Sequence, residues 1–372
     1  MKKIDIEKII TWHNNNCQKE LDIRHLTLEQ MQPYIEGLGS LFKVEKIGKS
    51  HQGRDIHKIV FGEGDSKILL WTQMHGNEST GTRAFLDLIQ FFTSPGEFSQ
   101  LADLILKECT IYCIPMLNPD GAQRYTRVNA QDIDLNRDVI DLKAIESQLL
   151  MRHLKNIDPE YCFNLHDQRT IFSIPPENQT ATMSFLAPSV DQERTLTEGR
   201  KDTMRAIVSM NKFIQQLVPG RVGRYTDEFY PTATGDNFQK MGHNTVLIES
   251  GHSKGDYQRK ESRRITFLAL LEGLRYISSS GEKTNYQEYF AIPNNEKKYL
   301  DIIMRNVVVS NVKNDIGILY VEQLKNGSLQ FKPTVDQIGN LEGFNADRFI
   351  DDKELKFDNN KDVEFWVENN IN

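Results

Sequence analysis

The 372-residue chain is short of long apolar runs, of basic residues and of cysteine. Nowhere do about 18 apolar residues follow one another, which is the length that a membrane-spanning helix needs. Asp5, Glu7 and Lys8 interrupt the apolar stretch that a signal peptide would require. Lys and Arg number 45 against 52 Asp and Glu, whereas binding to phosphate backbones needs a basic face. We therefore expect neither a membrane nor a nucleic acid as partner.

The four cysteines stand far apart, at Cys17, Cys109, Cys113 and Cys162. Cys109 and Cys113 share a strand-like run, where an extended chain holds them too far apart for an easy disulfide. Scattered, unpaired thiols are typical of a reducing compartment. Together with the absent signal peptide they predict a cytoplasmic protein, and its oligomeric state is left open.

What the chain does contain is an alternation of strand-like and helix-like segments, with 38% hydrophobic and 26% charged residues. Residues 1–42 form a predicted helical extension. Residues 43–282 alternate apolar runs with amphipathic ones, which predicts an α/β domain: a mixed, mainly parallel sheet with helices on both faces. Residues 286–372 show short alternating runs and a hairpin signal at Asn326-Gly327, and predict a small, mainly β C-terminal region with a frayed end.

Three side chains follow or end predicted strands and have the chemistry of metal ligands. His75 and Glu78 come just after the apolar run KILLWTQM, although a His-x-x-Glu pair alone is more typical of a turn. His166 ends the apolar run EYCFNLH. Carboxyl ends of parallel strands share one edge of a sheet, and a catalytic zinc ion takes three such ligands plus water. The sequence therefore predicts one Zn²⁺ site.

Further polar residues could complete such a site. In DLNR, Asn136 and Arg137 place an amide beside a guanidinium, a pair that can clamp a carboxylate; a capping turn with a surface ion pair is the alternative. Asp134 could orient a ligand histidine, and Arg127 could neutralise an oxyanion or carboxylate near the metal. Glu249 ends the apolar run NTVLIE and is either a surface glutamate or a general base aimed into a cleft.

The order of these motifs resembles that of the zinc carboxypeptidase family, in its cytosolic and bacterial branch. The resemblance covers about residues 43–275 and rests on GKSHQGRDIHKIVFG, HGNE, IPMLNPDG and DLNR, followed by a later His and a late Glu. It implies that Glu249 activates the metal-bound water and that Asp134 stands behind the first zinc histidine. It also implies the zinc ligand set His75, Glu78 and His166.

The same resemblance implies the substrate contacts. Arg127 matches the arginine that stabilises the oxyanion, with Arg124 as a rival in the same compact segment. Asn136 and Arg137 match the pair that grips the C-terminal carboxylate. Tyr230 resembles the mobile tyrosine that closes over the substrate, although its spacing to the late Glu is shorter than in the digestive enzymes.

We therefore predict a zinc metallocarboxypeptidase that hydrolyses the C-terminal amide bond of a peptide with a free carboxylate. One alternative is an N-acyl amino acid deacylase of the aspartoacylase or desuccinylase type, because that group shares the His-x-x-Glu, the later His and a DLNR-like pair. A second is an inactive carboxylate-binding or scaffolding protein on the same fold. The preferred side chain is left open: Asp236 could favour a basic residue or could cap a loop.

Overall fold

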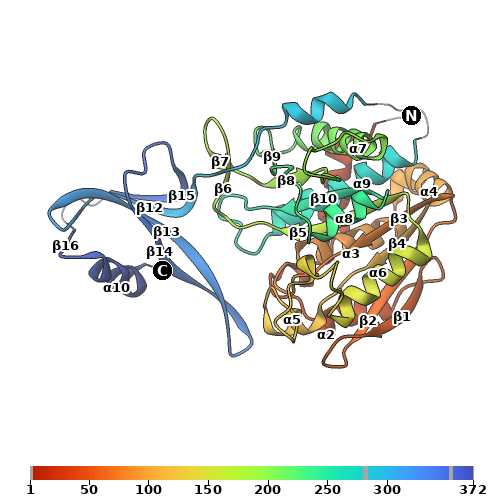
Figure 1. Cartoon of the computed structure of the whole chain (residues 1–372), viewed down its shortest axis with the longest axis horizontal. Helices are drawn as coiled ribbons and strands as arrows, with labels where there is room; N and C mark the ends of the chain where they lie inside the picture. The colour runs from red at the N-terminus through yellow and green to blue at the C-terminus, as the bar shows by residue number, and fades with distance from the viewer. Residues whose placement is uncertain (1–2, 280–283, 352–354, 372) are drawn as a thin grey trace.

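The computed structural model describes residues 3–279, 284–351 and 355–371. The predicted boundary at residue 282 and the last residue of the predicted C-terminal region, 372, lie outside them. Figure 1 shows a large body that carries the N-terminus and a smaller, β-rich part, coloured blue, that carries the C-terminus. Among the described residues, none of the helices has the length and apolar character needed to cross a bilayer.

The body is built on an eight-stranded mixed sheet with the strand order β1-β2-β4-β3-β5-β10-β8-β9. Its four central strands, β4-β3-β5-β10, pair in parallel, and antiparallel pairs flank them. This arrangement confirms the predicted mixed, mainly parallel sheet. The strands are β1 (Lys43–Lys49), β2 (Asp55–Phe61), β3 (Ser66–Trp71), β4 (Cys109–Ile114), β5 (Tyr161–Asp167), β8 (Met183–Leu186), β9 (Val222–Arg224) and β10 (Asn244–Ser250).

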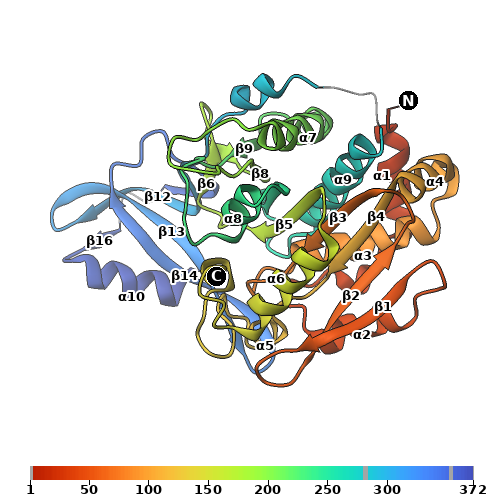
Figure 2. The same cartoon turned by 45° about the vertical axis from the view of Figure 1, so that its right-hand side comes forward.

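Helices cover both faces of this sheet (Figure 2) because its central strands are apolar on both sides. In β3, Ile68 and Leu70 belong to one hydrophobic core, and the alternate residues Leu69 and Trp71 belong to a second core on the other face. The first core is covered by α1 (Ile6–Asn16), α2 (Leu28–Glu36), α3 (Thr80–Thr93), α4 (Ser99–Glu108), α7 (Glu198–Ile214) and α9 (Lys260–Ile277). The second is covered by α6 (Ile145–Ile157) and α8 (Thr234–Lys240).

The parallel strands bring the polar strand ends to one edge. His75 follows β3 after a short turn, and His166 and Glu249 lie in the last residues of β5 and β10. In the pairing of these two strands, Glu249 stands directly opposite His166. The segment NPDG opens the short helix α5 (Pro119–Arg124), because the side chain of Asn118 caps its first turn.

The C-terminal part is a second, five-stranded sheet, in which β16 pairs beside the path β14-β13-β12-β15. The predicted hairpin turn at Asn326-Gly327 joins the two longest strands; both residues have positive φ, as a two-residue hairpin loop requires. The strands are β12 (Tyr299–Val309), β13 (Val312–Lys325), β14 (Ser328–Gly339), β15 (Asn345–Asp351) and β16 (Lys356–Phe357). A three-stranded sheet of β11 (Glu296–Lys297), β6 (Phe172–Ile174) and β7 (Gln179–Thr180) links this part to the body.

The expectation of a frayed C-terminal end is wrong. Residues Asn360–Asn370 form helix α10, and the side chain of Asn359 caps it by accepting from two backbone amides. Val363 and Val367, one helical turn apart, are buried against the C-terminal sheet. This single apolar stripe is enough to order a segment whose composition looks solvated.

Candidate active site

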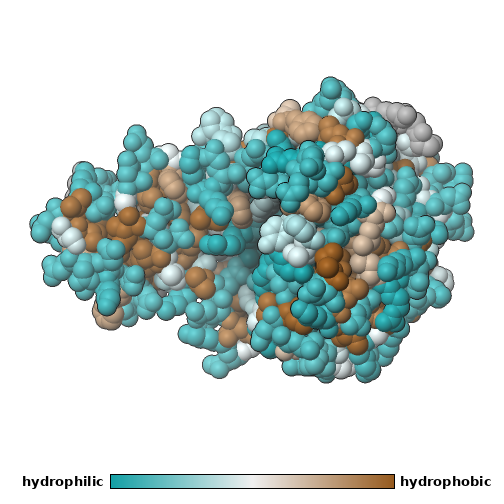
Figure 3. Space-filling model, viewed as in Figure 1, coloured by the Kyte–Doolittle hydropathy of each residue, from teal (hydrophilic) through white to brown (hydrophobic). Residues whose placement is uncertain are grey.

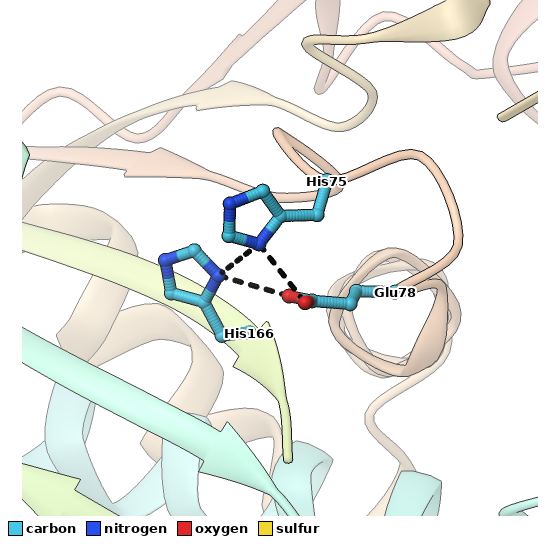
Figure 4. Close-up of side chains that lie close together, drawn as sticks. All are labelled: His75, Glu78 and His166. Atoms are coloured by element: carbon cyan, nitrogen blue, oxygen red, sulfur yellow. Dashed lines mark hydrogen bonds and ion pairs between the residues drawn. The ribbon is translucent and has the colours of Figure 1, made fainter. Parts of the chain in front are cut away.

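Three buried side chains converge at the carboxyl end of the sheet (Figure 4). His75 Nδ1 lies 2.9 Å from Glu78 Oε1, and His166 Nδ1 lies 2.9 Å from Glu78 Oε2. The two Nδ1 atoms are 3.1 Å apart. The structure thus brings together the three residues predicted as metal ligands.

The chemistry of this donor set fits a cation. His75 Nε2 lies 3.1 Å from Asp134 Oδ1, and because a carboxylate only accepts, Nε2 carries the proton. The lone pair on Nδ1 of a neutral His75 therefore faces a carboxylate oxygen of Glu78 and Nδ1 of His166. These electron-rich atoms repel one another unless a positive charge lies among them. Two imidazole nitrogens and one carboxylate oxygen are the ligands that zinc takes in catalytic sites.

The electrostatics of the ligands agree with this fit. Burial lowers the pKa of His166, which favours the neutral imidazole that binds metals. For His75, burial is outweighed by the negative charge of Glu78, so its pKa is raised. For Glu78, burial is outweighed by the two histidines, so its pKa is lowered. A proton or a metal ion is thus drawn to the centre of the group.

Arg127, rather than Arg124, reaches this group. Arg127 Nε donates to Asp134 Oδ2 at 3.0 Å, and its Nη1 lies 3.3 Å from His75 Nδ1. Arg124 instead donates to the backbone oxygen of Asn129. For Asp134, burial is outweighed by the hydrogen bond with His75 and by the charge of Arg127, so its pKa is lowered and it stays ionised.

Glu249 lines the same cavity as Glu78 and Arg127. Burial, reinforced by the negative charges of Glu78 and Asp167, raises the pKa of Glu249 well above its ordinary value. A carboxylate with a raised pKa is a stronger base than an exposed one and is suited to accept a proton near neutral pH.

Asn136, Arg137 and Tyr230 form a separate group. Arg137 Nη1 donates to the backbone oxygen of Asn136 at 2.7 Å, and the guanidinium carbon lies 4.3 Å from the centre of the Tyr230 ring. Asn136 Oδ1 accepts from the backbone amide of Thr234, at the start of α8. Tyr230 is 52% exposed, and its backbone amide donates to Asp236 Oδ1. Asp236 therefore caps the loop, one of the two roles left open for it.

The cavity beside the metal group, by which we mean His75, Glu78 and His166, is also lined by residues that the sequence analysis did not single out. It measures about 570 Å³ and is lined by Arg24, Tyr225 and Arg259 from the body, and by Glu322 from β13. These residues come from segments far apart in the chain. No local spacing could have identified them, because only the folded chain brings them together.

A second group with metal-ligand chemistry lies where the body meets the C-terminal sheet: His252, Asp301 and Asp347. His252 Nε2 lies 3.0 Å from Asp347 Oδ2, which also accepts from the backbone amide of Gly255. Asp347 Oδ1 accepts from the Tyr299 hydroxyl. His252 is thus held by its contact with Asp347.

The fold and the first group indicate a metalloprotein in which one candidate ligand, Glu78, lines a cavity. The sequence model of the zinc carboxypeptidase family matches residues 30–245, more than half of the chain, and the chain belongs to this family. The match contains the three candidate ligands and stops just before Glu249. Zinc is the metal of this family, in agreement with the predicted cofactor and with the His–Glu–His group.

Among curated relatives, the chain is similar to carboxypeptidase M of Mus musculus (26% identical over 198 residues, 46% of this chain and 45% of the relative). It is also similar to carboxypeptidase SOL1 of Arabidopsis thaliana (25% over 161 residues, 39% of this chain and 33% of the relative). The chain thus spans less than half the length of each of these two relatives.

Two solved structures show the same fold at low identity. One is a metallo-carboxypeptidase from Burkholderia cenocepacia, with a TM-score of 0.56, 13% identity, and coverage of 70% of this chain and 71% of that one. The other is bovine thrombin-activatable fibrinolysis inhibitor in complex with tick carboxypeptidase inhibitor, with a TM-score of 0.51, 14% identity, and coverage of 75% and 97%.

Proposed function

We propose that this protein is a zinc-dependent carboxypeptidase that removes the C-terminal residue of a peptide with a free carboxylate. His75, Glu78 and His166 would hold the ion. When bound, zinc lowers the pKa of water and polarises the scissile carbonyl. The observation that carries the proposal is the convergence of these three ligands beside Arg127 and Glu249 in a chain of the zinc carboxypeptidase family.

Glu249 acts as the general base. It accepts a proton from the attacking water and passes it to the nitrogen of the leaving amine, so that the carbon–nitrogen bond breaks and a free amino acid leaves. Its raised pKa supports this role, because a base that also returns its proton works best with a pKa near the working pH. Its position opposite His166 in the strand pairing keeps the carboxylate beside the ligand set.

Arg127 donates hydrogen bonds to the developing oxyanion, and Asp134 holds its guanidinium in place. Asn136 and Arg137 bind the terminal carboxylate of the substrate, and Tyr230 covers it. The contact between Tyr230 and Arg137 supports this grouping, because a ring stacked on the guanidinium leaves its edge free for a carboxylate.

The test compares three substrates with the purified, zinc-loaded enzyme: a peptide with a free C-terminal carboxylate, the same peptide as a C-terminal amide, and an N-acyl amino acid. We expect release of the C-terminal residue from the first, and a kcat/KM lower by roughly 10²-fold or more for the amide, which leaves the arginine unpaired. Turnover of the N-acyl amino acid alone would replace the proposal by deacylation, and no turnover with zinc bound would favour an inactive scaffold.

We further propose that the chain is organised as a helical extension (residues 1–42), a catalytic domain (43–282) and a C-terminal region (286–372). A cytoplasmic location belongs to the proposal as well, and is supported by the four unpaired cysteines. Cell fractionation with an antibody to the native protein tests the location.

A further inference from the structure

The β13–β14 hairpin extends from the C-terminal sheet to the side of the body. In Figures 1 and 2 its tip lies beside α5, the helix that precedes Arg127. Figure 3 shows the surface hollowed between the two parts of the molecule. The hairpin therefore lies along one side of the hollow between the two parts.

The hairpin lines the same cavity as the proposed catalytic residues. Residues 319–322 of β13 and 334–336 of β14 form one wall, and Glu78, Arg127 and Glu249 lie in the same lining. The cavity volume of about 570 Å³ falls within the range of roughly 300–1,000 Å³ that is typical of small-ligand pockets.

One contact fastens the wall beside Arg127. Glu322 accepts from the hydroxyl of Tyr125, and its Oε1 lies 2.5 Å from Arg24 Nη2. Arg24 is 8% exposed, so this ion pair is shielded from water on the side of the body. Tyr125 stands just before Arg127 in the chain, and the hairpin is thus tied to the segment that positions the oxyanion arginine.

A second contact fastens the C-terminal sheet beside Glu249. Asp347 of β15 accepts from the backbone amide of Gly255 at 2.8 Å and bonds with His252; both residues lie in the loop after β10, the strand that contains Glu249. The C-terminal sheet is therefore anchored next to both Arg127 and Glu249. These two anchors make the hairpin a fixed part of the site.

The proposed carboxylate clamp lies outside this cavity. Asn136, Arg137 and Tyr230 are absent from its lining, whereas Asn77 and Tyr225 belong to it. If the clamp holds the C-terminal end of the substrate, the remaining chain leaves the metal group through the cavity that the hairpin walls. An extended peptide adds about 3.3–3.6 Å per residue and soon meets the wall.

We propose that the β13–β14 hairpin is the wall that receives the part of the substrate N-terminal to the scissile bond, and that it restricts the enzyme to short peptides. This inference rests on the proposed carboxypeptidase function. It attributes the selection of substrates by length to a region outside the family match, which ends at residue 245.

Val321 offers the first test, because it lines the cavity and is 44% exposed, so that a larger side chain does not disturb a core. We compare Val321→Trp with Val312→Trp, a matched control on the same strand that is 59% exposed and outside the lining. The substrates are a dipeptide, a tetrapeptide and an octapeptide with the same C-terminal residue. Zinc content and thermal midpoint are measured for each variant.

We expect the wild type to favour the dipeptide and tetrapeptide over the octapeptide. Val321→Trp should lower kcat/KM for the tetrapeptide by roughly tenfold or more, with little change for the dipeptide, and Val312→Trp should match the wild type. Equal kcat/KM for all three lengths in the wild type and in Val321→Trp would overturn the inference and leave the proposed function intact. No hydrolysis of any of these peptides would instead remove the proposed function.

Glu322→Gln tests the opposite change, a loosened wall, because it removes the charge that ties the wall to Arg24. Its control is Glu368→Gln, which breaks the exposed pair of Glu368 on α10 with Lys332 on β14, both outside the cavity lining. We expect Glu322→Gln alone to raise kcat/KM for the octapeptide relative to the dipeptide by about threefold or more. An unchanged ratio of the two rates, with unchanged thermal midpoint, would argue against a wall that selects for length.

Discussion

Among the residues that the structure describes, two groups bring histidine and carboxylate side chains within ligand distance of one another, and they differ in the hydrogen-bond donors around their carboxylates. In both groups the candidate ligand atoms lie within 4.8 Å of one another. The group of His75, Glu78 and His166 has two imidazole nitrogens facing one carboxylate, and its carboxylate receives a single backbone amide, from Asp167. This group gains a favourable arrangement only with a cation at its centre.

In the group of His252, Asp301 and Asp347, the carboxylates are occupied differently. Asp347 receives a backbone amide and a tyrosine hydroxyl besides His252. Burial raises the pKa of Asp301, which disfavours the ionised form that a metal needs. The hydrogen-bond donors around the carboxylates therefore distinguish the two groups. One group is suited to bind metal, and the other to join two parts of the fold.

The largest expected effect tests this difference directly. His166→Ala should reduce the zinc content of the purified protein from one ion per chain to near zero and abolish peptidase activity, because two ligands hold zinc weakly. His252→Ala is the matched variant and should keep one zinc ion per chain. Elemental analysis measures the zinc content of both proteins. If the wild type contained two metal ions per chain and His252→Ala only one, the second group would bind metal too.

Glu249→Gln should leave zinc in place and lower kcat by about 10²–10⁴-fold, because the amide cannot take up the proton of the attacking water. The measurement is steady-state hydrolysis together with zinc content. Thr245→Ser, near the start of the same strand, serves as a control for disturbance of β10. Retained activity in Glu249→Gln with zinc bound would remove the general-base role from Glu249.

Asp347→Ala should destabilise the protein by roughly 3–5 kcal/mol, because it leaves His252, the Tyr299 hydroxyl and a backbone amide without their buried acceptor. Asp351→Ala, at the exposed end of the same strand, should change the free energy of unfolding by no more than about 0.5 kcal/mol. Urea unfolding measures both. Equal effects would mean that the second group does not fasten the C-terminal sheet.

Asp236→Asn should have the smallest effect, and one that depends on pH. Burial raises the pKa of Asp236 from 3.8 to about 6. Between these values the folded chain keeps a proton that the unfolded chain has released, so the contribution of Asp236 to stability falls as the pH rises through this window. Asn cannot ionise, and the variant should be more stable than the wild type above about pH 6, by at most about 3 kcal/mol.

Well below pH 3.8 the two proteins should unfold at the same urea concentration, because Asp236 is then neutral in both states. Unfolding curves at the two pH values check the prediction. A variant that is less stable at both would mean that the carboxylate is needed as the acceptor for the Tyr230 amide, and that its pKa matters little.

Much of the fold could be predicted because its signals are local. The apolar run of β3 is buried on both faces, and His75 follows it, so both the strand and the polar residue at its end could be predicted from this one segment. The fold class, the family and the zinc cofactor are confirmed. The roles of Glu249 and of Tyr230 stay predictions, since position alone does not assign a role.

What could not be predicted depends on contacts between distant segments. Arg24 and Glu322 carry no motif, and their pairing becomes visible only when the hairpin lies beside α5. Helix α10 was missed for another reason: its Asn-rich composition resembles a solvated tail, and only the spacing of Val363 and Val367 reveals an apolar face. Composition misled there because a few side chains, among them Val363, Val367 and Ile371, are buried against the sheet and outweigh the average of the segment.

The tie between Tyr125 and Glu322 joins residues 197 positions apart in the chain, and it has a consequence for biosynthesis. On the ribosome, the ligands and Glu249 are all present once residue 249 has been made, whereas the hairpin follows only with residues 312–339. During that interval the nascent chain would carry the groups for cleavage without the wall that selects for length. The anchors beside Arg127 and Glu249 form only after that interval, once β13 and β15 have been made.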